Sequence, residues 1–515
     1  SVQELCALET SLALVQTQAV TAPVPSVWLL TVGVQLAQGT HGAVHAGAWG
    51  LARSARVEAQ LPLRCADGPV DLLIACGGVA SEPELVLRAA GSLAPRLAHA
   101  PRLLERATFG ARVGEWQIVT GGTGGLGLLT GRWLAENGAG ALVAASRSGT
   151  VSHSTPTEWE RLCASGATVV VQQCDTSEPA HVRRLVALTQ GPSSAMGVWH
   201  AAGLLSDGVL PKQGAQSLAR VYASKAHGGW LLQVAYAAAP LRTCALFSSV
   251  AALFGGAGQA NYSAANACLD ALATHRHACG RVAVSMQWGA WAEVGMAARG
   301  VANERMAAME AASGFGRISP VQGLAALQTA VMPHAPSLLG MAPVQWSRML
   351  TDGAIGVPAF LVDMIPAASV RSRPTAAVQQ AAGSSVSLEA VLQMVRRTAG
   401  SAIDADAPLM EAGVDSLGAV ELRNQLQRAV GDDVLLSSTL MFDHPTARQV
   451  AVHLQGSNQA VPYASAVAGA PVEGSSAADV EVTGLSVTLP AGVGSFDALR
   501  EMIGCGRDLV RQIPA

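Results

Sequence analysis

Charged side chains are scarce in this sequence of 515 residues, because Asp, Glu, Lys and Arg together make up 13% of it, about half of their usual share in soluble proteins. The two signs nearly balance, with 33 basic and 36 acidic residues. No excess of positive charge is present to attract a polyanion. We therefore expect no nucleic-acid partner and no attraction to an anionic membrane surface.

Long uninterrupted hydrophobic runs are also lacking. Residues 10–52 contain no charged side chain, but glutamines, prolines and His41 interrupt them, so no stretch reaches the roughly 18–20 apolar residues that a membrane-spanning helix needs. The N-terminus does not show the basic region and short apolar core of a secretory signal. Because the chain begins with Ser1 rather than Met, we expect it to be a segment of a longer protein.

The nine cysteines form no C-x-x-C pair. Their odd number and their mostly apolar surroundings do not indicate a disulfide framework. We expect free, mostly buried thiols in a reducing, cytoplasmic compartment, and no metal site.

Two segments without periodicity, rich in Ala, Ser, Gly, Pro and Gln, predict linkers over 371–386 and 457–479. They separate a large block that ends at residue 370 from a small domain over 387–456. The segment 480–515 is too short to hold a core of its own. A chain of this length exceeds the roughly 250–300 residues at which one core usually stops growing, so several folded units are expected.

Short apolar runs alternate with helical patterns inside the large block. Such runs are typical of buried parallel strands, and residues 126–138 and 180–191 between them have helical periodicity. The alternation predicts an α/β fold with a doubly wound parallel sheet. Residues 1–115 alternate less clearly and contain no glycine fingerprint, so we expect them to form a structural half that supports the catalytic half, 116–370. The predicted strands are 116–120, 141–146, 168–172, 197–200, 243–248 and 282–287.

A glycine-rich segment, TGGTGGLG (120–127), lies between the first of these strands and an amphipathic helix. Glycines let the backbone approach a pyrophosphate, and a helix N-terminus offers free N–H groups and a favourable dipole. An ordinary flexible turn is the alternative, and the flanking strand and helix argue against it. The spacing is that of short-chain dehydrogenases rather than G-x-G-x-x-G. The predicted contacts are Gly121, Gly122, Thr123, Gly124, Gly125, Leu126 and Gly127.

The second strand ends in Ser146 and Arg147 rather than in Asp or Glu. An acidic residue would hold a ribose 2′-hydroxyl, whereas Arg accommodates a 2′-phosphate, so NADPH is favoured over NADH. The resemblance to short-chain dehydrogenases further implies that Asp175 lies beside the adenine. It also implies that Ala201 and Ala202 of HAAG (200–203) lie beside the nicotinamide ribose.

The segment FSSVAALFGGAGQANYSAAN (247–266) contains a strand end, two serines and a helix that carries Tyr262 and Asn266 on one face. Ordinary short-chain dehydrogenases have Lys four residues after the Tyr, where this chain has Asn266. Lys225 lies 37 residues before Tyr262 instead. In this arrangement the chain resembles the ketoreductase domain of modular polyketide synthases.

This resemblance implies a role for each residue of the set. Tyr262 would give a proton to the substrate carbonyl oxygen and Ser249 would hydrogen-bond to it, because hydride transfer places negative charge there. Lys225 would lower the pKa of the tyrosine, and Asn266 would order a proton relay. Taken singly, each can be an ordinary solvated, capping or core-edge residue. Only the presence of all four at the family's positions indicates an active site. The segments 48–59 and 286–296 are also similar to parts of this family, the second leading into its substrate lid.

The small domain resembles an acyl carrier protein of the same synthases. The motif G-x-D-S-L places Ser416 at the start of a helical pattern, and ELRNQL follows it. The resemblance implies a four-helix fold, with 387–400 and 441–454 as helices, and a covalent 4′-phosphopantetheine on Ser416, added by a phosphopantetheinyl transferase. A simple helix N-cap is the alternative for this serine. Residues 480–515 resemble the opening of a ketosynthase domain.

The leading hypothesis is an NADPH-dependent reductase of a carrier-bound β-ketoacyl thioester, working with ketosynthase and acyltransferase domains. A silent structural ketoreductase whose segment serves mainly as a carrier is one alternative, and a free-standing short-chain dehydrogenase is another. Within the family, Leu205 and Asp207 match a segment associated with the D-hydroxyl, although Ser206 replaces its first Asp. Phe254 replaces the Trp of the L-type. We expect the D-type product.

Overall fold

The computed structural model describes the chain from residue 2 to residue 456 with gaps. Among the predicted features, both linkers, residues 480–515 and Ser416 lie outside the described residues. The described residues are 2–35, 45–69, 71–72, 82–100, 110, 115–151, 156–189, 196–295, 314–332, 335–351, 359–364, 387–399, 404–409, 414, 422–423, 425–427, 429–430, 436 and 440–456.

A seven-stranded sheet, parallel at every pairing, forms the centre of the catalytic half. Its strand order is β11-β10-β9-β8-β5-β6-β7. The chain winds outward from β5 on one side and then returns to start again at β8, so a topological switch point lies between these two neighbours. The strands are β5 (Trp116–Thr120), β6 (Ala141–Ser146), β7 (Thr168–Gln173), β8 (Met196–His200), β9 (Leu241–Ser249), β10 (Val284–Trp288) and β11 (Leu338–Met341).

All six predicted strands are confirmed. The bounds of β5 and β6 are those expected, and the other four differ by one or two residues at one or both ends. β10 begins at Val284 rather than at Val282. The carbonyl of Val282 accepts a hydrogen bond of 3.2 Å from Nε of Arg276, so this residue still belongs to the connection after the helix.

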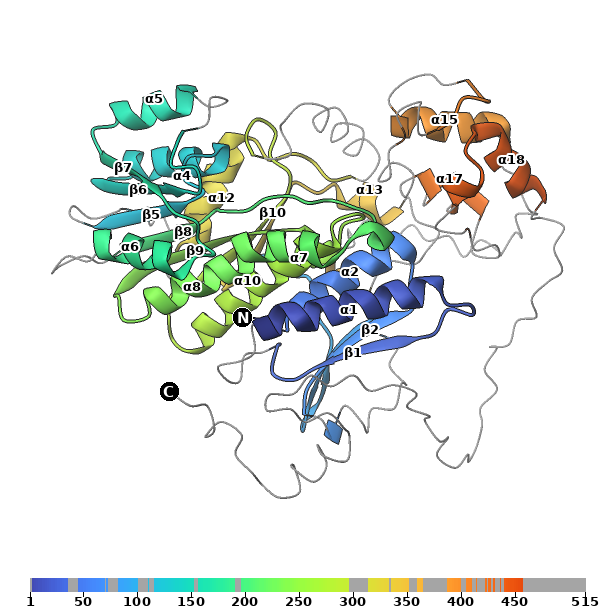
Figure 1. Ribbon diagram of the computed structural model, residues 1–515, viewed down its shortest axis with the longest axis horizontal. Coiled ribbons are helices and arrows are strands. Elements are labelled where there is room, and N and C mark those ends of the chain that lie inside the picture. The colour runs from blue at the N-terminus through green and yellow to red at the C-terminus, as the bar shows by residue number, and fades with distance from the viewer. Residues whose placement is uncertain are drawn as a thin grey trace. The chain divides into compact units, whose positions relative to one another are not determined.

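Helices cover both faces of this sheet (Figure 1). Leu128, Leu162 and Leu327 pack with Phe247 on one face, whereas Val182 and Leu232 pack with Val198 on the other. Alternate strand residues are therefore buried on opposite faces, which explains the continuous apolar runs. The first face carries α4 (Gly125–Glu136), α5 (Pro156–Ala164) and α12 (Pro320–Ala330), and the second carries α6 (Pro179–Thr189), α8 (Gly228–Ala235) and α10 (Ala260–Ala278).

The structural half has a smaller sheet of order β1-β2-β3-β4, in which only β4 is antiparallel to its neighbour. Its helix α2 packs closely on α10: a Cβ at Gly50 would lie 2.2 Å from the carbonyl oxygen of Ser263. Oγ of Ser54 donates to Oγ of Ser263 at 2.8 Å. The elements are α1 (Val2–Val20), β1 (Val27–Thr31), α2 (Gly47–Ala59), β2 (Leu63–Asp67), β3 (Glu84–Arg88) and β4 (Gly91–Leu93).

The described part of the small domain is helical and has its own apolar core. It contains α15 (Leu388–Ala399), α17 (Leu440–Asp443) and α18 (Ala447–Gly456). Val391 and Val395 of α15 are buried with Leu422, Leu426 and Val450. This agrees with the helices expected at both ends of a carrier fold.

Seven cysteines lie in the described part of the chain, and all are free thiols. Cys65, Cys174, Cys244 and Cys268 are buried as expected, whereas Cys6, Cys163 and Cys279 are exposed. Among the described helices, none is long and apolar enough to cross a membrane.

Candidate active site

The glycine-rich turn joins β5 to α4 at the carboxyl edge of the large sheet. Gly121 has a φ of +69°, which L side chains rarely adopt. A Cβ at this residue would lie 2.8 Å from the carbonyl oxygen of Ala201, and one at Gly127 would lie 2.1 Å from that of Gly121. Both glycines are therefore needed for the turn to pack against the end of β8 and against the helix.

The N-terminus of α4 fits an anionic ligand. Its N-cap, Gly124, provides no side-chain hydrogen bond, and the first turn carries no acidic side chain. A Cβ at Gly124 would meet only the carbonyl oxygen of Gly121, at 3.4 Å, so the space beside it is open. Open space, uncapped N–H groups and the positive end of the helix dipole are what a dinucleotide pyrophosphate requires. Thr123, Gly125 and Leu126 line the same turn.

Ser146 is the last residue of β6 and Arg147 follows it at the same edge, and the side chain of Arg147 is exposed. Asp175 lies just beyond β7, where Ser177 donates to its Oδ1 from the backbone N at 3.0 Å and from Oγ at 2.7 Å. Although burial opposes ionisation, these hydrogen bonds and the charge of Arg147 hold the pKa of Asp175 below its usual value. The structure thus brings Arg147 and an ionised Asp175 together where the adenosine end of a dinucleotide would lie.

His200 connects Thr120, next to the glycine-rich turn, to the helical segment that carries Lys225. Its Nε2 donates to the carbonyl oxygen of Lys225 at 2.9 Å, and its Nδ1 accepts from Oγ1 of Thr120 at 2.8 Å. Burial lowers the pKa of His200 to about 4, so the ring is neutral and this tautomer uses both nitrogens. Ala201 and Ala202 come next and pack against Gly121.

Lys225 lies in a π-helical turn, η2 (Ala223–His227), between α7 (Ala215–Tyr222) and α8. π-Turns inside helices are rare and are frequent at functional sites. The side chain is 4% exposed, and its Nζ donates to the carbonyl oxygen of Phe247 at 2.9 Å. Burial lowers the pKa of Lys225 to about 8, and the charge of Asp270 opposes that effect.

Tyr262 and Asn266 lie one turn apart on α10. Nδ2 of Asn266 donates to the carbonyl oxygen of Tyr262 at 2.9 Å, while the buried Oδ1 of Asn266 has no partner among the described residues. Ser249 ends β9, and its Oγ accepts from the backbone N of Ala251 at 3.2 Å. An unpaired amide oxygen below the tyrosine suits the relay role expected of Asn266.

Burial raises the pKa of Tyr262, and hydrogen bonds with Asn266 and Ser249 oppose that rise. Nζ of Lys225 lies 5.2 Å from the centroid of the tyrosine ring. The sequence led us to expect a pKa lowered by Lys225. In this structure the loss of hydration outweighs the neighbouring groups, so the hydroxyl holds its proton firmly.

Asp270, which the sequence analysis did not single out, lies beneath this set on α10. It accepts from Oγ of Ser285 at 2.6 Å and from Nε2 of Gln287 at 2.7 Å. Gln287 is the register partner of Ser248, next to Ser249. Asp270 follows Asn266 by four residues, so helical periodicity could have placed it on the same face.

Leu205 and Asp207 lie in the loop that follows HAAG, and both are exposed. Oδ2 of Asp207 accepts from Nε2 of Gln259 at 3.2 Å, in the loop before Tyr262. Phe254 packs edge-on against Phe315, with ring centroids 5.2 Å apart. The hydrogen bond from Gln259 therefore joins Asp207 to the loop that leads into α10.

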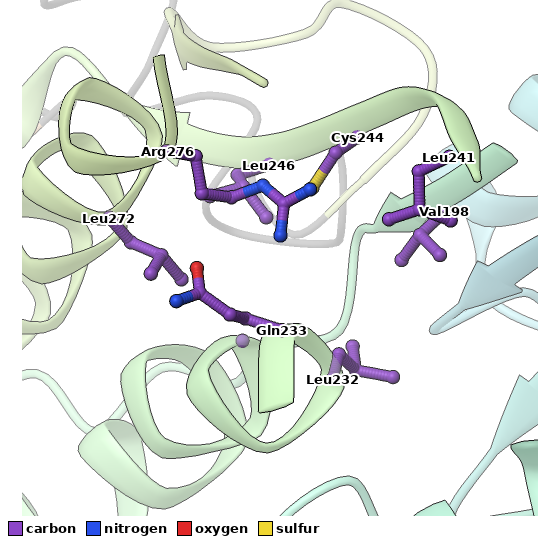
Figure 2. A pocket seen from close by; sticks show the side chains of 9 residues that line it. Val198, Leu232, Gln233, Leu241, Cys244, Leu246, Leu272 and Arg276 are labelled. Atoms are coloured by element: carbon purple, nitrogen blue, oxygen red, sulfur yellow. The ribbon is translucent and has the colours of Figure 1, made fainter. Parts of the chain in front are cut away.

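Figure 2 shows a separate pocket between α8, α10, β8 and β9. Its lining is mostly apolar, and Arg276 and Gln233 each contribute one buried polar atom, Nη1 and Oε1, without a partner among the described residues. None of the predicted site residues lines this pocket, so we assign it no part in the reaction.

Comparison with known proteins agrees with this geometry. A family model described as KR domain matches residues 115–293, and one described as phosphopantetheine attachment site matches residues 389–454. Polyketide synthase GfsB of Streptomyces halstedii is 34% identical over 96% of this chain, and mycoketide-CoA synthase of Mycobacterium tuberculosis is 31% identical over 78%. The chain spans 9% and 10% of the lengths of these two relatives.

Solved structures agree as well. One described as A-type ketoreductases from a modular polyketide synthase has a TM-score of 0.63 and 30% identity, covering 70% of this chain and 78% of that one. The first ketoreductase of the tylosin synthase has a TM-score of 0.59 and 31% identity, covering 69% and 78%. The chain therefore belongs to the modular polyketide synthases, as a ketoreductase domain followed by a phosphopantetheine carrier domain.

Proposed function

We propose that this chain reduces a β-ketoacyl thioester, held on a phosphopantetheine arm, to the β-hydroxyacyl thioester with NADPH. The observation that carries this proposal is the joint placement of Lys225, Ser249, Tyr262 and Asn266 beside the glycine-rich turn. All four come from elements at the carboxyl edge of the large sheet, where ligands of doubly wound folds bind. NADPH, when bound, supplies the hydride that reduces the carbonyl carbon.

Residues of the chain stabilise the negative charge that forms on the substrate and donate the proton. Hydride arrival makes the carbonyl oxygen negative, and Tyr262 donates its phenolic proton to that oxygen while the Ser249 hydroxyl donates a hydrogen bond. Below the ring, the positive charge of Lys225 favours the tyrosinate left behind. The free Oδ1 of Asn266 accepts a hydrogen bond from a relay water through which Tyr262 regains its proton.

The preference for NADPH rests on Arg147. A guanidinium presents several N–H donors to a 2′-phosphate, and no acidic residue stands at the end of β6 to bind a free 2′-hydroxyl. Arg147 is exposed, and its charge acts on the carboxylate of Asp175. The cofactor contacts proposed are therefore the turn 121–127, Ser146, Arg147, Asp175, Ala201 and Ala202.

Ser416 is the proposed attachment point of 4′-phosphopantetheine, within the matched carrier domain. A phosphopantetheinyl transferase would load it, and ketosynthase and acyltransferase domains would deliver and accept the acyl chain. Residues 480–515 are proposed, from their sequence alone, as the opening of a ketosynthase. The proposed domain limits are 1–115, 116–370 and 387–456, with linkers between and after the last two.

For the product we propose the D-hydroxyl. Asp207 is retained in the loop after HAAG, and Phe254 occupies the position of the L-type Trp. The charge of Asp207 acts on Tyr262, and in this proposal Asp207 and Phe254 bias the side from which the acyl arm enters.

The deciding experiment is NADPH oxidation by the purified chain with an N-acetylcysteamine β-ketoacyl thioester, with the hydroxyacyl product identified by mass spectrometry. Stoichiometric oxidation and product formation are expected. A chain that binds NADPH and accepts phosphopantetheine but forms no product would favour the silent, carrier-only alternative instead.

A further inference from the structure

Two loops that flank the active site are tied into one unit. The first, 205–210, carries Asp207, and the second, 255–261, includes the first two residues of α10 and leads into Tyr262. The backbone N of Gly208 donates to the carbonyl oxygen of Gly258 at 2.8 Å, and Nδ2 of Asn261 donates to that of Ser206 at 2.8 Å. Together with the contact between Gln259 and Asp207, these bonds join the two loops.

A single carboxylate from the structural half holds both loops. Oε2 of Glu58, on α2, accepts from the backbone N of Gly258 at 2.8 Å, and its Oε1 accepts from the backbone N of Leu210. Gly258 has a φ of +74°, a conformation that a larger residue would rarely adopt there. The side chain of Glu58 thus spans two segments that lie about 150 and 200 residues further along the chain.

Neighbouring residues of α2 strengthen the same attachment. Oγ of Ser54 accepts from the backbone N of Gly256 at 3.1 Å, and Nη1 of Arg53 donates to the carbonyl oxygen of Ala252 at 2.6 Å. A Cβ at Gly255 would lie 2.5 Å from the carbonyl oxygen of Arg53. The backbone from 252 to 258 therefore follows α2 closely.

Glu58 is 4% exposed, and such burial of a carboxylate is costly unless its oxygens are hydrogen-bonded. Burial raises the pKa of Glu58, and the bonds from Leu210 and Gly258 oppose that rise. No step of the proposed reaction uses this group. What it does in the structure is fix the distance between two loop backbones.

We propose that Glu58, a residue of the structural half, is a positioning residue that determines stereospecificity. It fixes the two loops, and these form the wall along which the acyl–pantetheine arm enters. This inference rests on the proposed reductase function and adds a role for the half that has no nucleotide motif. The position of Asp207 and of the 255–261 backbone limits which carbonyl face can meet the hydride. Releasing either loop therefore lets both faces react, whichever hydroxyl epimer predominates in the wild type.

The test is Glu58→Gln. A glutamine offers one oxygen acceptor, and its amide NH₂ would face the other backbone N–H, donor against donor, so one loop is released while the size of the side chain is kept. A matched control is Asp67→Asn, since Asp67 is likewise buried and accepts from two backbone N atoms, those of Val34 and Gln35, at 2.9 and 3.1 Å. These partners, and the Thr31 and Arg88 side chains that also contact the Asp67 carboxylate, lie in the structural half, far along the chain from either loop.

Each variant is assayed for the ratio of the two hydroxyl epimers by chiral chromatography, for the KM of NADPH, and for hydrogen exchange of peptides covering the two loops. We expect Glu58→Gln to move the epimer ratio about tenfold toward equality, the effect of losing one charge-assisted hydrogen bond. Exchange in both loops should be faster and the KM of NADPH unchanged. Asp67→Asn should leave the ratio and the loop exchange as in the wild type.

An unchanged ratio in Glu58→Gln, or an equal change in Asp67→Asn, overturns the proposal. If the wild type makes both epimers in equal amounts, the hydrogen exchange of the two loops tests the proposal. Unaltered exchange in Glu58→Gln then contradicts it. Should Glu58→Gln not fold, Glu58→Asp is measured, because it keeps the charge and is too short to reach both N–H groups. A wild type that forms no product contradicts the reductase assignment instead. If the wild type is active, a negative result in Glu58→Gln contradicts only the role of Glu58.

Discussion

Nζ of Lys225 lies 5.2 Å from the centroid of the Tyr262 ring, although the two residues come from different helical segments. Two hydrogen bonds hold the lysine in this position. Its carbonyl oxygen accepts from His200 and its Nζ donates to the carbonyl oxygen of Phe247. The lysine that ordinary short-chain dehydrogenases place one turn after the tyrosine is thus replaced by one that reaches the same ring from η2. Asn266 takes its place on α10, where we propose that it serves the relay.

Tyr262→Phe should abolish most turnover without weakening NADPH binding. The ring and its packing remain and only the proton donor is lost, so we expect kcat to fall by about 10²–10⁴-fold. Tyr236→Phe is the control, because Tyr236 is also buried but its hydroxyl bonds to Thr189. Turnover of Tyr262→Phe close to that of Tyr236→Phe would remove Tyr262 from its role.

The activity should fall as the pH rises through about 8. The charged form of Lys225 supports the tyrosinate, and burial lowers the pKa of this lysine to about 8, so the cation is lost above that pH. The groups that face it are Asp270 and the neutral His200, whose pKa is about 4. The alkaline limb of the kcat profile reports this titration.

Asp270→Asn should move that limb to lower pH. The substitution removes the negative charge that opposes the fall in the pKa of Lys225, while an amide can still accept from Gln287 and donate to Oγ of Ser285. Ser285→Ala, which loses a hydrogen bond and keeps the charge, should leave the limb nearly in place. Equal shifts in both variants would indicate a structural effect rather than an electrostatic one.

Arg147→Asp should weaken NADPH far more than NADH. The carboxylate repels a 2′-phosphate and can accept from a free 2′-hydroxyl, so the ratio of the two KM values should change by at least about tenfold. Arg161→Asp is the control, since Arg161 is also exposed but lies on α5. A similar loss for both cofactors would show that Arg147 does not read the 2′-phosphate.

Ser416→Ala should abolish loading of the phosphopantetheine arm. Incubation with a phosphopantetheinyl transferase and coenzyme A should add the mass of one arm to the wild type and to Ser437→Ala, a serine of the same domain outside the motif. The chain bearing Ser416→Ala should keep its original mass and its reductase activity on a free thioester. Modification of that variant at any other serine contradicts the assignment.

Local patterns predicted the parts of this molecule whose structure depends on nearby residues. The strand that ends at Thr120, the turn at Gly121 and the face shared by Tyr262 and Asn266 all follow from periodicity and glycine spacing. The π-turn at Lys225 does not, because its geometry depends on partners such as His200 and Phe247 that lie 25 and 22 residues away, respectively.

The sequence did not predict the role of α2 either. Glu58 occupies a helical position with no motif around it, and its partners, Leu210 and Gly258, contribute only backbone N–H groups, which no sequence pattern marks. Segment 48–59 could be matched to a family by resemblance, but the contact with the catalytic loops required the fold.

The wild-type product from an unbranched β-ketoacyl thioester should be predominantly the D-alcohol. Asp207 is held by Gln259 on the wall beside α10, and Phe254 is packed against Phe315 and Phe360, so no indole projects where the L-type Trp would stand. Ser206 uses its carbonyl oxygen to accept from Asn261, but its side chain lacks the charge of the Asp found there in the D-type. A bias of only about 1.4 kcal/mol between two entry poses changes the product ratio tenfold, so Ser206→Asp should raise the share of the D-alcohol. Chiral chromatography of both products measures this. A predominantly L-alcohol from the wild type would contradict the stereochemical assignment and leave the reductase assignment standing.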